Sequence, residues 1–179
     1  FVDLLAPVAA VAVDSSPAVA EFGRAASEPL VDWLLDRLER LCTRPLYVEF
    51  RSFLTYHDET LAETTPEAAT DPPSDYYEQF CAAMRDTGFP DLFVEYPVLG
   101  RWVGTVVEQF RATVTEFRDR LAADRETLAD EFGVSGSPTA VQPLTEDTHA
   151  GGRSPFAVAF ETGRVVYKPR PTTGFATLS

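Results

Sequence analysis

The chain has 179 residues, of which 45% are hydrophobic and 24% are charged, so it can form one domain with a substantial core. Its formal net charge of −13 and pI near 4.5 create a surface that repels nucleic acids and anionic membranes, which argues against both as partners and predicts neither nucleic-acid binding nor a membrane span. Of the 15 basic residues only one is a lysine, and this arginine-rich, acidic composition suggests a salt-adapted protein from a GC-rich genome.

The first third of the sequence predicts helices followed by one strand. Residues 1–13 are apolar but too short to span a bilayer, so they are either a buried segment or the cut edge of a longer protein. Serines at 16 and 27, each followed closely by proline, look like helix N-caps, and the second is predicted to open a helix that runs to about residue 42. Residues 44–54 alternate like a strand, with Leu46, Val48 and Phe50 on one side.

The middle of the chain predicts an acidic, proline-containing loop over residues 57–75 and then helices. The first helix covers about 74–85 and buries Tyr76, Phe80 and Met84. A longer helical stripe begins in "YPVLGR" at 96–101 and is predicted to end at Gly133, a residue typical of helix stops. The apolar residues of this stripe, all expected in the core, are Leu99, Trp102, Val103, Val106, Phe110, Val114, Phe117, Leu121, Leu128 and Phe132.

After Gly133 the apolar period changes to two, which predicts strands at 139–144, 155–161 and 164–169. "ETGR" is a tight hairpin turn between the last two strands, and "TEDTHAGGRS" is a longer loop between the first two. The predicted fold class is therefore α+β. A mainly helical region, 1–133, leads into a small antiparallel sheet, 134–179, that has the element order of a kinase N-lobe and is an incomplete domain.

Several kinds of site are excluded by the motifs. The sequence has no GxxxxGK[ST], GxGxxG, HExxH or CxxC motif, and "GVSGS" lacks the strand and final glycine of a nucleophile elbow. Cys42 and Cys81 are predicted to be buried core thiols rather than a disulfide or metal pair. With only two histidines, a histidine-rich zinc centre is excluded.

Lys168 is the only lysine and lies on the last predicted strand, downstream of Gly151 and Gly152. Paired glycines let backbone N–H groups approach an anion closely, and a lysine on a stiff strand offers a fixed cation. This pattern is typical of a loop and lysine that bind nucleotide phosphates. From the residues alone, an edge-strand lysine with a solvated head group is an equally good interpretation.

The stretch "EDTHAGGRSPFAVAFETGRVVYKPRP" resembles the core of the dehydratase domain of class II (LanM-type) lanthipeptide synthetases. That family shows a D-x-H, a glycine pair followed by Arg or Lys, an apolar strand, a G-K/R turn and V-Y-K-P-R. Upstream, "RPLYVEFRSF", "YPVLGR" and "FRDRLAADRETLADEFG" are also similar to family elements. The resemblance covers about residues 40–171.

The resemblance implies a lipid-kinase-like fold that uses ATP and Mg²⁺ to phosphorylate Ser and Thr of a ribosomal precursor peptide. Elimination of the phosphate then leaves dehydroalanine or dehydrobutyrine. By position, Lys168 would contact ATP phosphates, and Gly151, Gly152 and Arg153 would shape the nucleotide loop. Asp147 and His149 match the D-x-H that handles phosphate during phosphorylation or elimination. Arg170 also matches the motif, with a structural ion pair as its expected role.

The resemblance also implies what the chain lacks. Only 11 residues follow Lys168 and the sequence contains no asparagine, so the Asp base and the Asp and Asn ligands of Mg²⁺ are not expected here. The family's zinc-binding cyclase domain is not expected either, and no zinc is assigned to this chain. We therefore expect a cytoplasmic fragment that is inactive alone. Its partners would be the leader and Ser/Thr-rich core of the precursor peptide and the remainder of the synthetase.

Two other functions remain open from the sequence. One is a non-catalytic helical binding or scaffold module, and the other is the N-lobe of another ATP-dependent phosphotransferase. Binding of nucleotide without binding of peptide would favour the latter.

Overall fold

A computed structural model describes residues 1–57, 74–144 and 152–169. In chain order its helices are α1 (Val2–Asp14), α2 (Pro17–Ala20), α3 (Arg24–His57), α5 (Ser74–Ala83), a π-helix η1 (Met84–Gly88), α6 (Phe89–Glu95), α7 (Pro97–Ala123) and α8 (Arg125–Phe132). The strands β1 (Ala140–Pro143), β2 (Phe156–Phe160) and β3 (Gly163–Tyr167) follow. The predicted α+β class is confirmed.

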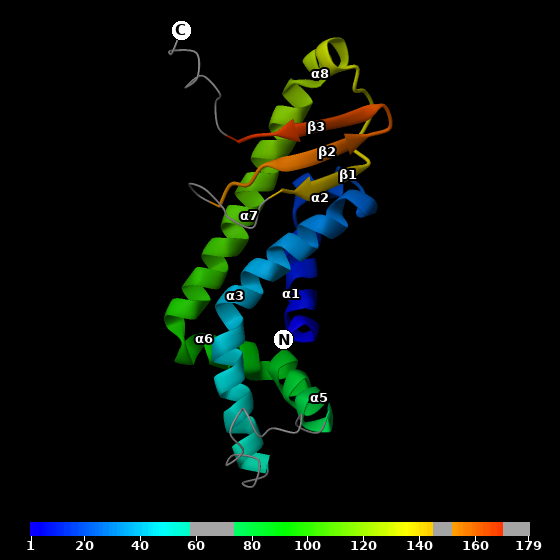
Figure 1. Ribbon diagram of the computed structural model, residues 1–179. Coiled ribbons are helices and arrows are strands. Elements are labelled where there is room, and N and C mark those ends of the chain that lie inside the picture. Colours follow the sequence, from blue (N-terminus) through cyan, green and yellow to red (C-terminus); the bar gives the residue numbers. More distant parts are fainter. Residues whose placement is uncertain (58–73, 145–151, 170–179) are drawn as a thin grey trace.

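The long helices α3 and α7 form the framework of the molecule, and the sheet lies against them (Figure 1). The apolar N-terminal segment is the helix α1, which packs on α3 and buries Leu4, Leu5 and Val13. One hydrophobic core includes side chains from α1, α3, α7 and all three strands. The helices and the sheet are therefore stabilised by a shared core.

The strand predicted at 44–54 is wrong, because these residues continue α3 to His57. Leu46, Phe50 and Leu54 recur every four residues and are 0%, 7% and 3% exposed, whereas Val48 is 46% exposed. The spacing of the buried positions is helical, and the alternation was coincidental. Pro45 lies inside the helix and removes one backbone hydrogen bond, and Figure 1 shows α3 changing direction along its length.

The helical conformation of residues 44–54 can be tested with two substitutions. Leu46→Ala is expected to lower the free energy of unfolding by about 2–5 kcal/mol, because it removes a fully buried side chain. Val48→Ala should change it by less than about 0.5 kcal/mol, since Val48 faces solvent. Urea denaturation of the two variants measures the difference. Equal losses would indicate that the two side chains share one buried face, as in a strand.

Two further details of the helices differ from the sequence prediction. The helix expected to open at Ser27 begins at Arg24, so that Pro29 lies inside α3. Trp102 and Phe132, expected in the core, are 55% and 64% exposed. The predicted continuous stripe is interrupted at Asp124, after which α8 buries none of its residues. None of the described residues packs over the exposed part of the Trp102 side chain.

Other predictions about the helices are confirmed. Phe80 and Met84 are buried, while Tyr76 is half-buried. Cys42 and Cys81 are buried free thiols, and burial raises the pKa of Cys42 to about 11. The predicted loop at 57–75 lies almost wholly outside the described residues. Within the described ranges, no helix combines the length and the apolar character needed to cross a membrane.

Gly133 ends α8 as the sequence predicts. It adopts a left-handed conformation with φ +66°, and its N–H and that of Val134 donate to the carbonyls of Ala129 and Leu128. This paired closure is a Schellman motif, in which glycine is favoured because it carries no Cβ. The chain then turns into the sheet.

The three strands form an antiparallel meander in the order β1-β2-β3, within two residues of their predicted positions. Phe156 pairs with Tyr167, Val158 with Val165, and Val141 with Val158. Phe156, Val158 and Phe160 lie on one buried face, as predicted. Phe156 contacts rings from both long helices, at centroid distances of 5.0 Å to Phe117 and 5.6 Å to Trp33.

Candidate functional site

Lys168 immediately follows β3 and is exposed. Tyr167, its neighbour, turns inward against the ring of Phe117 on α7, with a centroid distance of 5.1 Å. Since side chains alternate along a strand, Lys168 and Val166 lie on the opposite, solvent-facing side. Among the described residues, Lys168 has no hydrogen-bond or ion-pair partner. Its charge is therefore available to a ligand.

A groove of about 700 Å³ lies beside Lys168, between β3 and the end of α7 with α8. Its wall is mostly apolar, and its charged groups are the cations Arg120, Arg164 and Lys168 with a single acid, Asp124. This is a local excess of positive charge on a chain whose net charge is −13. The groove is lined by Phe117, Arg120, Leu121, Asp124, Leu128, Phe132, Val158, Arg164, Val165, Val166, Tyr167 and Lys168. A volume and lining of this kind suit an anionic small molecule with an apolar part.

Gly152 lies where the loop before β2 meets α7, and it requires glycine for two reasons. Its φ is +81°, in the left-handed region that favours glycine. A Cβ built there would lie 2.7 Å from Oε1 of Gln109 and 3.1 Å from Nη2 of Arg37. The buried hydroxyl of Thr113 donates to the Gly152 carbonyl at 3.5 Å. The backbone at this end of the loop is thus held close to α7.

Gly152→Ala is expected to destabilise the chain more than Gly136→Ala does. Both glycines have positive φ, +81° and +87°, so both variants carry a similar backbone cost of about 1–2 kcal/mol. Only the Gly152 variant adds a side-chain clash, because nothing lies within 4 Å of a Cβ at Gly136. The clash should add about 1–3 kcal/mol. Thermal or urea unfolding measures both, and equal losses would contradict the close approach.

Arg153 follows Gly152 and is fixed to α7 by an ion pair. Its Nε donates to Oε2 of Glu116 at 2.8 Å, and this hydrogen bond is the main reason that the pKa of Arg153 is raised. The other carboxylate oxygen of Glu116 pairs with Nη2 of Arg120. The guanidinium of Arg120 lies 5.8 Å above the ring of Tyr167. Contacts on α7 therefore connect the loop residue Arg153 with the strand that carries Lys168.

Three of the six predicted site residues are described, and the structure brings them to the same end of the sheet. The pairing of Phe156 with Tyr167 places the segment after Arg153 beside the segment that enters Lys168. Asp147, His149 and Gly151 lie outside the described residues, as does Arg170. Their predicted roles stay predictions.

The sequence interpretation missed the polar residues of α7 that support this region. Gln109, Thr113, Glu116 and Arg120 recur at spacings of four, three and four, and they contact Arg37, Gly152, Arg153 and Tyr167. The signal was present as a second, polar stripe beside the apolar one. Its targets are at least 37 residues away in the chain, so the spacing alone could not identify them.

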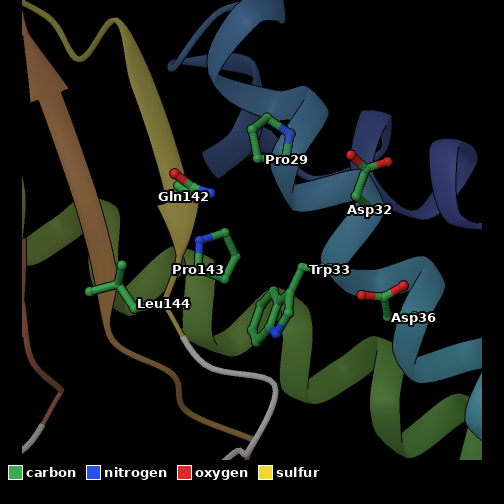
Figure 2. Close-up of a pocket in the computed structure, with 7 residues that line it drawn as sticks. All are labelled: Pro29, Asp32, Trp33, Asp36, Gln142, Pro143 and Leu144. Atoms are coloured by element: carbon green, nitrogen blue, oxygen red, sulfur yellow. The ribbon is translucent and has the colours of Figure 1, made fainter.

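A second pocket, of about 270 Å³, lies between α3 and β1 (Figure 2). Pro29, Asp32, Trp33 and Asp36 line it from α3, and Gln142, Pro143 and Leu144 line it from the strand side. It contains none of the predicted site residues. Trp33 is 5% exposed, and the guanidinium of Arg37 lies 5.3 Å from the centre of its ring. Among the described residues, neither Nε1 of Trp33 nor Nη1 of Arg37 has a hydrogen-bond partner. Burial lowers the pKa of Arg37.

Metal binding finds no support in the part of the chain that the structure describes. Across residues 1–57, 74–144 and 152–169, no group of three or more His, Cys, Asp or Glu side chains is arranged to hold an ion. The described residues therefore supply no ligand set of their own for the Mg²⁺ that the resemblance implies.

Comparison with known families matches the part of the chain that carries the candidate site. A family model described as a domain of unknown function (DUF4135) matches residues 96–176, a range that begins at the N-cap of α7 and includes α8 and all three strands. This domain is found in lanthipeptide synthetase-like proteins. No curated protein matches the chain.

Proposed function

We propose that this chain binds nucleotide phosphates as part of a peptide dehydratase of the class II lanthipeptide synthetase type. The observation that carries the proposal is the position of Lys168. It is exposed, it has no ion-pair partner among the described residues, and it borders a groove rich in positive charge. The glycine loop ends on the adjoining strand. The match of residues 96–176 to a domain found in lanthipeptide synthetase-like proteins supports the same function.

The chemistry of this function sets the task of these residues. In the first step, the hydroxyl of a Ser or Thr gives its proton to a base and its oxygen attacks the γ-phosphorus of ATP, the bond to the bridging oxygen breaks, and ADP leaves. In the second, a base removes the α-proton of the phosphorylated residue and phosphate leaves, forming dehydroalanine or dehydrobutyrine. Positioning and charge stabilisation supply most of the catalysis in phosphoryl transfer. A fixed cation such as Lys168 provides both for the phosphate chain of ATP.

The proposal is tested by comparing how the chain binds ATP and adenosine. In this proposal Lys168 and the loop contact the phosphate groups of ATP rather than its adenine base. ATP is therefore expected to bind more tightly than adenosine in isothermal titration calorimetry. Equal affinities, or no affinity for ATP, would overturn the phosphate site. The reaction type is tested in a protein that contains this sequence together with a catalytic lobe. We expect its precursor peptide to lose one water per modified Ser or Thr by mass spectrometry.

Transfer to a peptide without loss of water would point instead to another ATP-dependent phosphotransferase. Both outcomes are read in one mass spectrum, since a retained phosphate adds mass and dehydration removes it.

A further inference from the structure

Glu116 occupies a central position between the glycine loop and the lysine strand. One oxygen of its carboxylate accepts from Arg153 at 2.8 Å, and the other pairs with Arg120 from the next turn of α7. The Glu116 side chain is 25% exposed, less than either arginine. A single carboxylate therefore holds two guanidinium groups that belong to different parts of the site.

Each of the two arginines that Glu116 holds fixes a different segment of the chain. Through Arg153, Glu116 holds the residue that follows Gly152, whose backbone is already packed against Gln109 and Thr113. Through Arg120, it holds a guanidinium over the ring of Tyr167, the residue directly before Lys168. Tyr167 is also stacked on Phe156 in the neighbouring strand, with ring centroids 6.1 Å apart. Glu116 on α7 thus holds in place both of the segments that would contact phosphate.

We propose that Glu116 is a positioning residue that sets the placement of Gly152 and Arg153 relative to Lys168. This inference rests on the proposed function, because it assigns the placement to phosphate binding. Glu116 itself does not touch the ligand. It acts through Arg153 and Arg120, whose guanidinium groups both pair with its carboxylate.

The carboxylate is required rather than a side chain of the same shape. Glutamine offers one acceptor oxygen, and its NH₂ group is a donor that would face one of the two guanidinium groups. Glu116→Gln therefore keeps the packing of α7 but loses the contact with one of the two arginines. Glu116→Asp retains both oxygens on a shorter stem and is expected to restore part of the function.

The matched control is Glu108→Gln. Glu108 lies on the same helix and forms an ion pair with Arg111 at 3.1 Å, away from the loop and the lysine strand. Both substitutions remove one acidic charge from α7 and one intrahelical pair. The difference between them isolates the contacts to Arg153 and to the arginine over Tyr167.

The experiment measures binding of ATP and adenosine by wild type, Glu116→Gln, Glu116→Asp and Glu108→Gln. For Glu116→Gln we expect ATP affinity to fall about 2- to 5-fold, as for the loss of a partly exposed ion pair, with adenosine affinity unchanged. Glu108→Gln should match wild type. A purely structural role predicts equal losses for both ligands that follow the melting temperature, and this result would overturn the positioning role.

Hydrogen exchange without ligand separates this inference from the proposed function. Glu116→Gln should accelerate amide exchange in both segments, 152–156 and 164–168, while Glu108→Gln should not. Unchanged exchange in either segment overturns the inference even if ATP binds. If wild type binds no ATP, the proposed function fails, and the assignment of Glu116 to phosphate binding fails with it, whatever the exchange data show.

Discussion

Phe156→Ala is expected to lower the free energy of unfolding by about 3–5 kcal/mol, the largest stability effect that a single truncation should have in this sheet. Phe156 is fully buried and lies in the central strand. Its ring contacts Trp33 from α3, Phe117 from α7 and Tyr167 from β3, with centroid distances of 5.0–6.1 Å. Truncation would leave a cavity where the sheet meets both long helices.

The control for this variant is Phe132→Ala, which removes the same side chain from the end of α8. Because Phe132 is 64% exposed, the loss should stay below about 0.5 kcal/mol. Urea denaturation followed by circular dichroism measures both variants. Similar losses at the two positions would show that the sheet does not share a core with α3 and α7. They would also remove the basis for placing Lys168 relative to α7.

The sheet could be predicted because several local signals agreed. Phe156, Val158 and Phe160 alternate with small residues, and "ETGR" supplies a two-residue turn, so period and turn chemistry indicate the same hairpin. The sequence also contains a glycine at the αL position that ends α8. Such features depend on neighbours within a few residues, which is why one sequence suffices.

The helix α3 shows where local patterns fail. In residues 44–54, alternation and a four-residue repeat are both present, because Leu46 and Phe50 satisfy each of them. Pro45 favours a break between a helix and a following strand, yet α3 continues through this residue. What decides between the two is packing, since Leu46, Phe50 and Leu54 join the common core. That partner surface comes from elements far away in the sequence and is not visible in a window of eleven residues.

The residues of the candidate site also differ in whether the sequence alone could identify them. Lys168, Gly152 and Arg153 could be predicted as site residues because their chemistry is carried by residue type and order along the chain, and their roles stay predictions. Glu116 could not, since a glutamate on a helix is ordinarily one of many solvated acids. Its significance arises from a contact with Arg153, 37 residues away, that only the folded chain establishes. Supporting residues of this kind are typically found from structure rather than from motifs.

Lys168→Met is expected to have the largest effect on function. Loss of one contact between an ammonium group and phosphate should weaken ATP binding by about 10- to 100-fold, the range of a charge-assisted hydrogen bond. Adenosine binding should not change, because the contact proposed for Lys168 is with phosphate only. Stability should change by less than about 0.5 kcal/mol, since the side chain is exposed and has no partner among the described residues.

Arg164→Met distinguishes a specific contact from a general effect of charge. Arg164 lies on the same face of β3 and lines the same groove, so its removal lowers the positive charge there by the same amount. If the groove attracts ATP only through its field, both variants should lose affinity equally, and both losses should shrink as salt is raised. If Lys168 holds phosphate directly, its variant should lose at least about tenfold more than the Arg164 variant at every salt concentration. Titration of the two variants with ATP at low and high salt decides between these results, and undiminished ATP binding by Lys168→Met would overturn the assignment of this residue.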